Sequence, residues 1–227
     1  MPYRRTENVA RRLAARHGAI MTAAREVAAD GGMAALQIVP VAQRAGIAAG
    51  TVYRYFPGKT DLVAAVLAEI ADREIGALRR AAAVAPGPLS ALAAAIMTFA
   101  TRALRHRRLA YAVIAEPVDA ELDAARRSFR AALAAEFGSL IGAATKGNHL
   151  PEQDAALSAA ALLGLLIEGS IGPLAPAVPN IDGAPRAAVQ SLTLIGLRAH
   201  GVADARARGL VIAGIREQQS VIRNSDP

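Results

Sequence analysis

The sequence has no cysteine and no tryptophan, and its 227 residues include only four Tyr and four Phe. Without cysteine the chain can form neither a disulfide nor a thiolate metal site, so nothing ties it to an oxidising compartment. The N-terminus is charged throughout and lacks the apolar segment of a secretory signal. We therefore expect a cytoplasmic protein.

Long hydrophobic runs are also missing. The most apolar stretch, AALSAAALLGLLI at 155–167, spans 13 residues before Glu168 interrupts it, and a bilayer-spanning helix needs about 18 or more. We expect a buried helix there and no membrane partner. The basic stretch RALRHRRLA at 102–110 does not place its arginines on one narrow face, which favours a solvated surface over a membrane-surface helix.

Residue patterns typical of catalysis or metal binding are weak. The four histidines are scattered, with no two at i, i+4 spacing, so a helical zinc site is unsupported. His17 shares a face with Leu13 and Met21, which favours a partly buried structural residue. EGSIG at 168–172 lacks the first glycine of a nucleophile elbow. We expect no catalytic residues, no metal and no cofactor.

Alanine and leucine dominate a composition that is 53% hydrophobic, and both residues lose little side-chain freedom in a helix. No strand-like alternation is present, so we predict an all-α fold. Apolar spacing, glycines and prolines predict helices at 8–30, 39–45, from about 48, 59–80, 89–106, 108–115, 120–143, 152–171 and 185–200. The segment after His200 is mixed, and we expect part of it to be disordered.

The positive charge is concentrated at one end. The net charge is +7, and residues 1–60 contain nine Lys or Arg against three acidic residues, which accounts for +6 of it. A basic field of this kind favours a polyanionic partner. In the same region two short predicted helices flank a turn at Gly46, within a three-helix unit, which is the helix-turn-helix arrangement.

Two late helices, near 152–171 and 185–200, have wide apolar faces and few charges. Faces of this width exceed what a monomer usually exposes, which favours a homodimer through these helices over a monomeric helical core.

The stretches VAQRAG and GTVYRYFPGKTDL, with Gly31-Gly32 before them, resemble the DNA-binding domain of TetR-type (TetR/AcrR) transcriptional regulators over residues 10–65. The resemblance implies a helix-turn-helix DNA-binding domain with a basic arm at 1–62. It also implies a helical ligand-binding and dimerisation domain at 63–200, followed by a tail at 201–227. Beyond the first domain it rests only on length, helicity and the late apolar helices.

In this family the third helix enters the DNA major groove. Small residues at Gly50 and Thr51 would let the backbone approach, and Tyr53 and Lys59 would contact phosphates. Phe56 would anchor the small core with Tyr55 at its edge. The resemblance thus implies contacts with double-stranded DNA from Arg4, Arg5, Gln37, Ala48, Ala49, Gly50, Thr51, Tyr53, Arg54 and Lys59.

Two positions depart from the family pattern. Ala48 stands where a serine usually caps the recognition helix, which costs about 1 kcal/mol of local helix stability, and Ala49 replaces a polar or basic residue. Two alanines donate no hydrogen bonds to bases, so direct readout would rest on Thr51, Arg54 and either Gln43 or Gln37. Shape-based recognition is the other source of specificity.

The resemblance further implies a repressor that a small-molecule effector releases from a near-palindromic operator. Candidate pocket walls are Phe99, Tyr111, Phe129 and Phe137, with Glu116 or Glu168 as polar anchors, although each can equally be an ordinary core or surface residue. The alternative is a helical small-molecule-binding protein or enzyme without specific DNA binding. A phosphate-binding loop at Gly58-Lys59-Thr60 is excluded because Tyr53 stands where that motif needs glycine.

Overall fold

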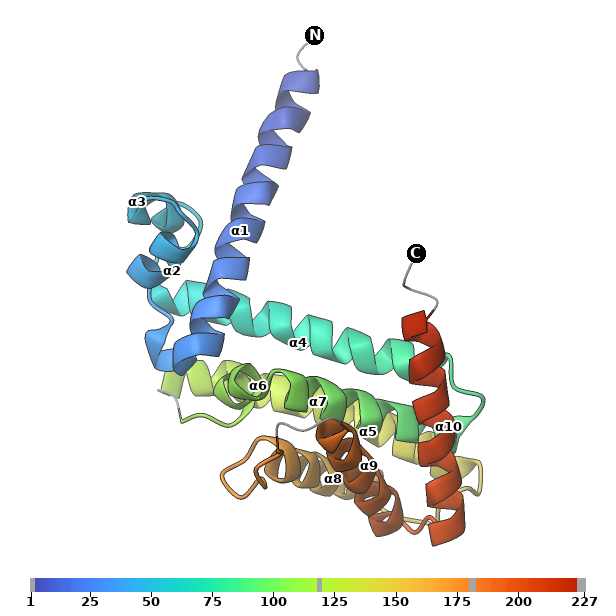
Figure 1. Cartoon of the computed structure of the whole chain (residues 1–227). Coiled ribbons are helices and arrows are strands. Elements are labelled where there is room, and N and C mark those ends of the chain that lie inside the picture. Colours follow the sequence, from blue (N-terminus) through green and yellow to red (C-terminus); the bar gives the residue numbers. More distant parts are fainter. Residues whose placement is uncertain (1–2, 118–119, 180–182, 224–227) are drawn as a thin grey trace. The chain divides into compact units, whose positions relative to one another are not determined.

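A computed structural model describes the backbone of residues 3–117, 120–179 and 183–223, and the side chains of 8–117, 123–179 and 183–215. Within these ranges every regular element is an α-helix, which confirms the predicted fold class (Figure 1). In chain order the helices are α1 (Tyr3–Ala35), α2 (Ile38–Arg44), α3 (Ala49–Tyr53), α4 (Lys59–Ala83), α5 (Pro88–Arg105), α6 (Arg107–Ile114), α7 (Ala120–Lys146), α8 (Ala155–Ser170), α9 (Ala184–Ala199) and α10 (Asp204–Arg223).

The helix boundaries follow the local signals in the sequence. For α2 to α9, each helix end that was predicted from the sequence lies within three residues of the observed end. Pro40 lies in the first turn of α2, where its missing N–H breaks no intrahelical hydrogen bond. Among the described residues, no helix combines the length and the apolar character that a membrane span requires. The same residues contain no group of three or more His, Asp or Glu side chains suited to a metal ion.

Two compact units make up the chain. The N-terminal unit comprises residues 1–70 and 108–127, and the C-terminal unit comprises residues 71–107 and 128–227. The helices α4 and α7 each contribute residues to both units. The N-terminal unit therefore includes a segment far away in the sequence, which a division of the chain at residue 62 leaves out.

The core of the N-terminal unit is built from one face each of α1, α2, α3 and α4. Ile20, Ala24 and Ala28 recur every four residues of α1 and are completely buried, as expected of an amphipathic helix. Val52 of α3 and Leu62 of α4 are equally buried. Two short helices are thus held against two longer ones by a small apolar core.

Gly32 interrupts α1, as the Gly31-Gly32 pair predicted. Its backbone has φ 76° and ψ −174°, a conformation that is almost restricted to glycine. The helix bends there and makes one further turn to Ala35 before Gln37 begins the path into α2.

In the C-terminal unit, α5 is the central helix. It contacts α8, α9 and α10, and α8 and α9 also contact each other. Leu92, Ile96 and Met97 of α5 are buried to within 1% of their surface. The rings of Phe99 on α5 and Phe137 on α7 meet edge to face, with their centroids 6.3 Å apart.

Most of the segment after His200, part of which we expected to be disordered, forms α10. Ala207, Val211 and Ile215 recur at four-residue spacing on one face and are buried, and α10 packs on α9 and α5. Gly209, Gly214 and the exposed Ile212 lie between these positions, and they obscured the periodicity in the sequence.

Candidate nucleic-acid interface

The turn between α2 and α3 depends on Gly46. This residue has φ +67°, in the left-handed region that glycine adopts without steric cost. Its N–H donates to the carbonyl of Gln43 at 3.1 Å, and the N–H of Ile47 donates to the carbonyl of Ala42 at 3.0 Å. The turn thereby satisfies carbonyls at the end of α2 and starts α3 in a new direction.

The N-terminus of α3 has no side-chain cap. Ala48 occupies the N-cap position in extended conformation, and no side chain accepts a hydrogen bond there. Thr51 donates its N–H to the carbonyl of Ala48 at 2.9 Å, the first hydrogen bond of this short helix. The missing cap that the sequence predicted at Ala48 is thus confirmed.

Two buried residues hold α3 in place. Val52 is fully buried and Phe56 is 5% exposed, and the N–H groups of Tyr55 and Phe56 both donate to the carbonyl of Val52 at 2.9 Å. Because α3 has only five residues, it cannot be stable by itself. Its orientation is set by these anchors.

The opposite face of this segment is open to solvent. Ala48, Gly50, Tyr53 and Arg54 are exposed there, and Ala49 and Thr51 are half-buried beside them. These are the positions for which the sequence predicted DNA contacts. The structure places them together on one outward surface, and their contact with DNA stays a prediction.

Gly50 is not required by the fold. A Cβ atom at this position would meet no other atom within 4 Å, and the backbone does not adopt a positive φ. Alanine would therefore fit and would favour the helix. The fold itself gives no reason for glycine at position 50, which is consistent with close approach of an external partner to the backbone.

The aromatic residues after α3 pack against α1. The ring of His17 lies 5.4 Å from that of Phe56 and 6.2 Å from that of Tyr55, measured between centroids. His17 is exposed, so the prediction of a partly buried residue is wrong. Phe56 is a core residue and Tyr55 is half-buried at its edge, as expected.

The remaining predicted DNA-contact residues lie outside α3. Lys59 is the first residue of α4 and is half-buried. Gln37 precedes α2, and its side-chain amide donates to the carbonyl of Ala34 at 3.2 Å. Arg4 and Arg5 fall in the first two turns of α1, and their side chains lie outside the described residues.

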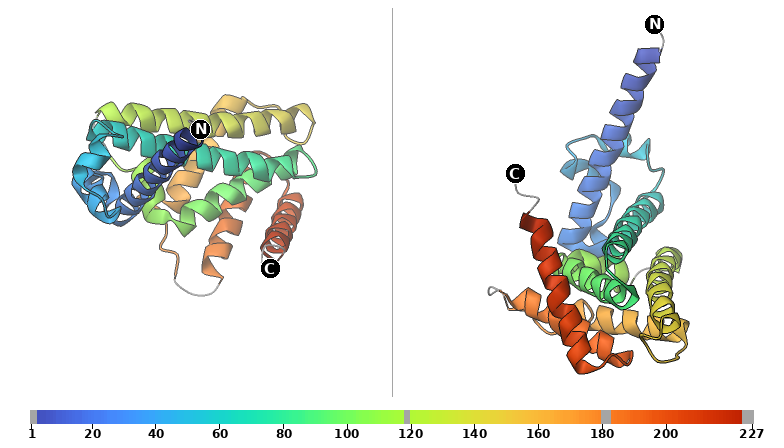
Figure 2. Two further views of the ribbon diagram at one scale, coloured as in Figure 1. Left: turned by 90° about the horizontal axis from the view of Figure 1, so that it is seen from above. Right: turned by 90° about the vertical axis from the view of Figure 1, so that its right-hand side faces the viewer.

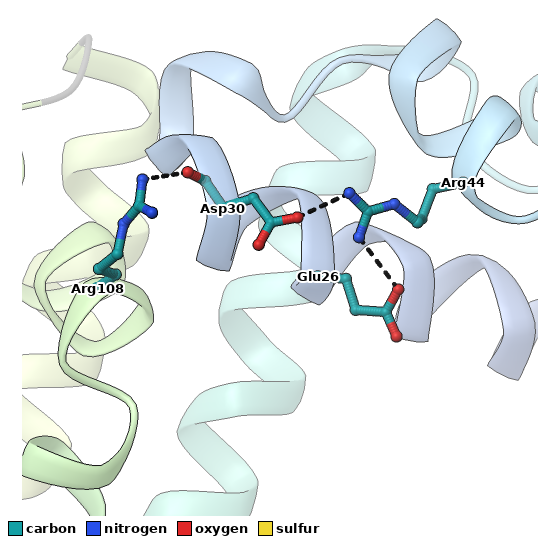
Figure 3. Close-up of polar contacts among 4 residues, drawn as sticks. All are labelled: Glu26, Asp30, Arg44 and Arg108. Carbon is teal, nitrogen blue, oxygen red and sulfur yellow. Dashed lines mark hydrogen bonds and ion pairs between the residues drawn. The ribbon is translucent and has the colours of Figure 1, made fainter.

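An ionic cluster supports the corner between α1 and α2 (Figure 3). Arg44 of α2 donates to the carboxylates of Asp30 at 2.7 Å and Glu26 at 3.4 Å, both on α1. These hydrogen bonds, chiefly the one to Asp30, raise the pKa of the Arg44 guanidinium. Arg108 of α6 donates to the backbone carbonyl of Asp30. The end of α1 is thus tied both to α2 and to a later helix.

Glu116 reaches the same corner from the end of α6. Its carboxylate accepts the N–H of Met33 at 2.9 Å, directly after the bend at Gly32. A Cβ at Gly32 would lie 2.8 and 2.9 Å from the two carboxylate oxygens, so the absence of a side chain makes room for Glu116. Arg126 of α7 donates to the backbone carbonyl of Glu116.

Sequence reasoning missed this role of Glu116. The partners are 83 residues apart, and a carboxylate hydrogen-bonded to one backbone N–H has no local pattern. The only signal was the Gly31-Gly32 pair, which marked a helix end and not its partner. A contact between Glu116 and a ligand stays a prediction.

The other predicted pocket residues are distributed over both units. Phe99, Phe129 and Phe137 are buried in the C-terminal unit, where the first and last contact each other. Tyr111, half-buried on α6, belongs to the N-terminal unit together with Glu116. Glu168 is exposed near the end of α8, which agrees with the solvent-facing alternative. A ligand pocket among these residues stays a prediction.

Comparison with known proteins identifies the helix-turn-helix segment. Residues 20–66 match the family model described as bacterial regulatory proteins, tetR family. Over 54 residues the chain is 44% identical to the HTH-type transcriptional repressor KstR of Rhodococcus jostii (strain RHA1), covering 24% of this chain and 26% of that protein. The matched region thus spans about a quarter of this relative's length.

The fold likeness extends further than the sequence likeness. The fatty acid degradation regulator FadR from Bacillus halodurans aligns with a TM-score of 0.68 and 21% identity, over 80% of this chain and 97% of that one. The regulator RolR, in complex with its ligand resorcinol, aligns with a TM-score of 0.61 and 21% identity, over 89% and 95%. Most of this chain therefore shares the fold of these two regulators.

Proposed function

We propose that this protein is a DNA-binding transcriptional repressor that acts in the cytoplasm as a homodimer and leaves its operator when a small molecule binds. The observation that carries the proposal is the outward face of α3. Gly50, Tyr53 and Arg54 are exposed there, within the segment that matches the tetR-family model. The similarity to KstR, itself a repressor, supports repression over activation.

In the proposed complex, α3 lies in the major groove, whose width of about 12 Å admits one helix. Gly50 lets the helix backbone come close to the bases. The hydroxyl of Tyr53 and the ammonium of Lys59 bind phosphates on either side of the groove, and the N-terminus of α4 favours negative charge at that point.

Base recognition then rests on few side chains. Thr51 and Arg54 supply hydrogen bonds, and the methyl groups of Ala48 and Ala49 contact thymine methyls. Gln37 retains one amide N–H and its carbonyl oxygen after donating to Ala34. With so few polar contacts, the sequence-dependent shape of the operator contributes to specificity.

The outer faces of α8 and α9 are the proposed dimer interface. Leu157 on α8 is 69% exposed and Ile195 on α9 is 50% exposed, although α8 and α9 contact each other through their buried residues. Ala160 and Ala161 are also exposed on α8. A second copy would cover this apolar surface and place two α3 helices about 34 to 36 Å apart, or a multiple of that distance.

The proposed effector site lies among the helices of the C-terminal unit, with Phe99, Phe129 and Phe137 as candidate walls. RolR, which shares the fold, was crystallised with resorcinol, and this supports a small-molecule ligand. Effector binding would favour a spacing of the two α3 helices that does not fit the operator. By linkage, DNA weakens effector binding by the same factor.

The test compares binding of the purified protein to its own upstream DNA with binding to a scrambled duplex of equal length. Fluorescence anisotropy measures both affinities across a salt series. We expect preferential binding of the upstream duplex by a dimer. Lys59→Ala should reduce the slope of log K against log salt by about one counterion. Tyr53→Phe, which removes only the hydroxyl, should weaken binding to both duplexes.

Two outcomes contradict the proposal. Equal and steeply salt-dependent binding to both duplexes would mean that the basic surface attracts any polyanion. Absence of binding at low salt would instead favour a helical small-molecule-binding protein or an enzyme. Circular dichroism of each variant separates loss of contact from loss of folding.

A further inference from the structure

A hollow of about 730 Å³ lies beside the recognition helix, within the N-terminal unit. One wall is the N-terminal half of α1, which stands clear of the other helices of this unit (Figure 2). The other wall comes from the turn before α3 and from Tyr55 just after it. The lining residues are Val9, Arg12, Leu13, Ala15, Arg16, Ala19, Ala45, Ile47 and Tyr55.

The whole α1 wall lies outside the segment that the family model matches. The family model begins at residue 20, whereas α1 begins at Tyr3. The α1 residues that line the hollow end at Ala19. The match to the family model therefore assigns no role to Arg12 or Arg16.

Among the residues whose side chains are described, the lining of the hollow contains two positive charges and no negative one. These charges belong to Arg12 and Arg16. They lie one turn apart on the same side of α1, about 6 Å along its axis. Both are exposed, and the hollow is therefore electrostatically suited to an anion with more than one charge.

Among the described side chains, these two arginines differ from their neighbours in having no protein partner. Arg25 pairs with Glu69, Arg44 with Asp30 and Glu26, and Arg11 donates to Asn8 at 3.0 Å. In the part of the chain whose side chains are described, neither Arg12 nor Arg16 has a hydrogen bond or ion pair. The paired arginines stabilise the unit, and the unpaired ones remain available to a ligand.

The hollow also has an apolar component. Val9 and Leu13 are 53% and 50% exposed, and Ile47 faces them from the other wall. A ligand that fills this space needs anionic groups for the arginines and apolar surface for the aliphatic side chains. The DNA backbone offers both, since charged phosphates alternate along it with apolar deoxyribose rings.

The position of the hollow favours DNA over other anions. Ala45 and Ile47 precede α3, and Tyr55 follows it. An elongated ligand that lies against the outward face of α3 would continue directly into the hollow. A duplex held in the proposed way satisfies this requirement, whereas a small anion has no reason to select a site beside α3.

We propose that the extended N-terminal half of α1 and the α2–α3 turn form a second DNA contact, a cleft for one strand of the backbone. Arg12 and Arg16 each bind a phosphate, and Val9 and Leu13 pack on deoxyribose. This inference rests on the proposed function, because it assumes that α3 binds duplex DNA. Residues before the family segment thereby contribute to the affinity for DNA, but they recognise no bases.

The experiment uses the full-length protein and its own upstream duplex, with anisotropy titrations across a salt series. For B-DNA the slope of log K against log salt falls by about 0.9 for each phosphate contact. We therefore expect Arg12→Ala and Arg16→Ala each to reduce the slope by about 0.9, and the double variant by about 1.8. The preference for the upstream duplex over the scrambled one should be unchanged.

Arg11→Ala is the matched control. Arg11 is equally exposed and adjacent in sequence, but it does not line the hollow and is hydrogen-bonded to Asn8. For Arg11→Ala, the slope of log K against log salt should stay at the wild-type value. Phosphate ethylation interference gives a second readout, in which Arg12→Ala and Arg16→Ala each lose interference at one or two phosphates while those contacted from α3 remain.

Several results would overturn the inference while leaving the proposed function intact. In one such result, the double variant has the wild-type slope of log K against log salt and still prefers the upstream duplex. Another is an equal slope change in Arg11→Ala, which would indicate a diffuse basic field. Arginine-dependent binding to vesicles of anionic lipid, with unchanged DNA binding, would assign the hollow to a membrane surface. If wild-type protein fails to prefer its upstream duplex, the proposed function itself fails.

Discussion

Tyr53, Tyr55 and Phe56 stand within four positions of the sequence, yet each has different surroundings. Tyr53 is exposed on the outward face of the α3 segment, Tyr55 is half-buried and Phe56 is in the core. Because α3 ends at Tyr53, the three side chains do not share one helical face. A small domain with few aromatic residues thus uses them both for its core and at its candidate interface.

Gly50 allows the interface to be tested apart from stability. Alanine at this exposed helical position should raise the free energy of unfolding by about 0.5–1 kcal/mol. If DNA approaches the backbone here, the added methyl group should nevertheless lower the affinity for the upstream duplex. Urea denaturation and anisotropy on the same preparation measure both quantities.

The control for this substitution is Gly142→Ala in α7. This glycine also has open space on its side-chain side, because an added Cβ would meet no other atom within 4 Å, and it belongs to the C-terminal unit. The substitution should give a comparable gain in stability and no change in affinity. Unchanged DNA affinity in Gly50→Ala would mean that the backbone of α3 does not come close to DNA.

At the scale of elements, the corner between α1 and α2 depends on α6. Glu116 accepts the N–H of Met33 and Arg108 donates to the carbonyl of Asp30. Neither residue lies in the helix-turn-helix, yet both bind backbone groups at its edge. The helix-turn-helix is therefore completed by residues 108–127, which cluster with it in one unit.

Replacement of Glu116 tests this support. Glu116→Ala leaves the N–H of Met33 without its charged acceptor, and we expect a loss of about 1.5–3 kcal/mol in the free energy of unfolding. Glu116→Gln keeps an acceptor oxygen and should lose less. Hydrogen exchange at the Met33 amide should accelerate in the alanine variant. An alanine variant as stable as the glutamine variant would show that the hydrogen bond contributes little.

A second element-scale contact joins α9 and α10. Asp204, the first residue of α10, accepts hydrogen bonds from Arg208 at 2.8 Å and from Arg198 of α9. The bond from Arg208, and then that from Arg198, lowers the pKa of Asp204, against an opposing effect of burial. The contribution to stability is therefore complete above about pH 4, the unfolded value, and is lost as the pH falls through the lower folded pKa.

Asp204→Asn should consequently be less stable than wild type at pH 7, and the difference should shrink towards pH 2–3. Thermal unfolding at several pH values, at low salt, measures this because exposed ion pairs are screened at high salt. Asp72→Asn, at another exposed aspartate, is the control. A difference between wild type and Asp204→Asn that is independent of pH would contradict the titration of Asp204 as its cause.

At the scale of the whole molecule, the proposed dimer makes a prediction about avidity. Leu157→Asp combined with Ile195→Asp would place charges on the exposed apolar faces of α8 and α9, and should yield monomers in sedimentation equilibrium. Affinity for the upstream duplex should fall on the order of 100-fold or more, since one half-site contact is lost.

Val84→Asp provides the matched control for the dimer. Val84 is 83% exposed and lies between α4 and α5, away from α8 and α9 in the sequence. It should remain dimeric with wild-type affinity. Monomers that retain full affinity, or a double variant that stays dimeric, would remove α8 and α9 from the assembly.

The sequence by itself determined the helices and the character of the α3 segment. Both are local properties, because Gly46, Pro40 and the spacing of Val52 and Phe56 act within a few residues. Tyr53 at an exposed position, Phe56 in the core and the missing cap at Ala48 were all predicted correctly for this reason. The α10 helix was missed because two glycines, Gly209 and Gly214, and the exposed Ile212 interrupt the spacing of its three core positions.

Only the tertiary structure decided which distant groups meet. The pairing of Glu116 with Met33, the link from Arg108 to Asp30 and the hollow lined by Arg12, Arg16 and Tyr55 join segments without any shared sequence period. Such contacts depend on the direction in which each helix leaves its turn and on the burial of its other face. Local propensities fix where a helix begins and ends, whereas packing selects its partners.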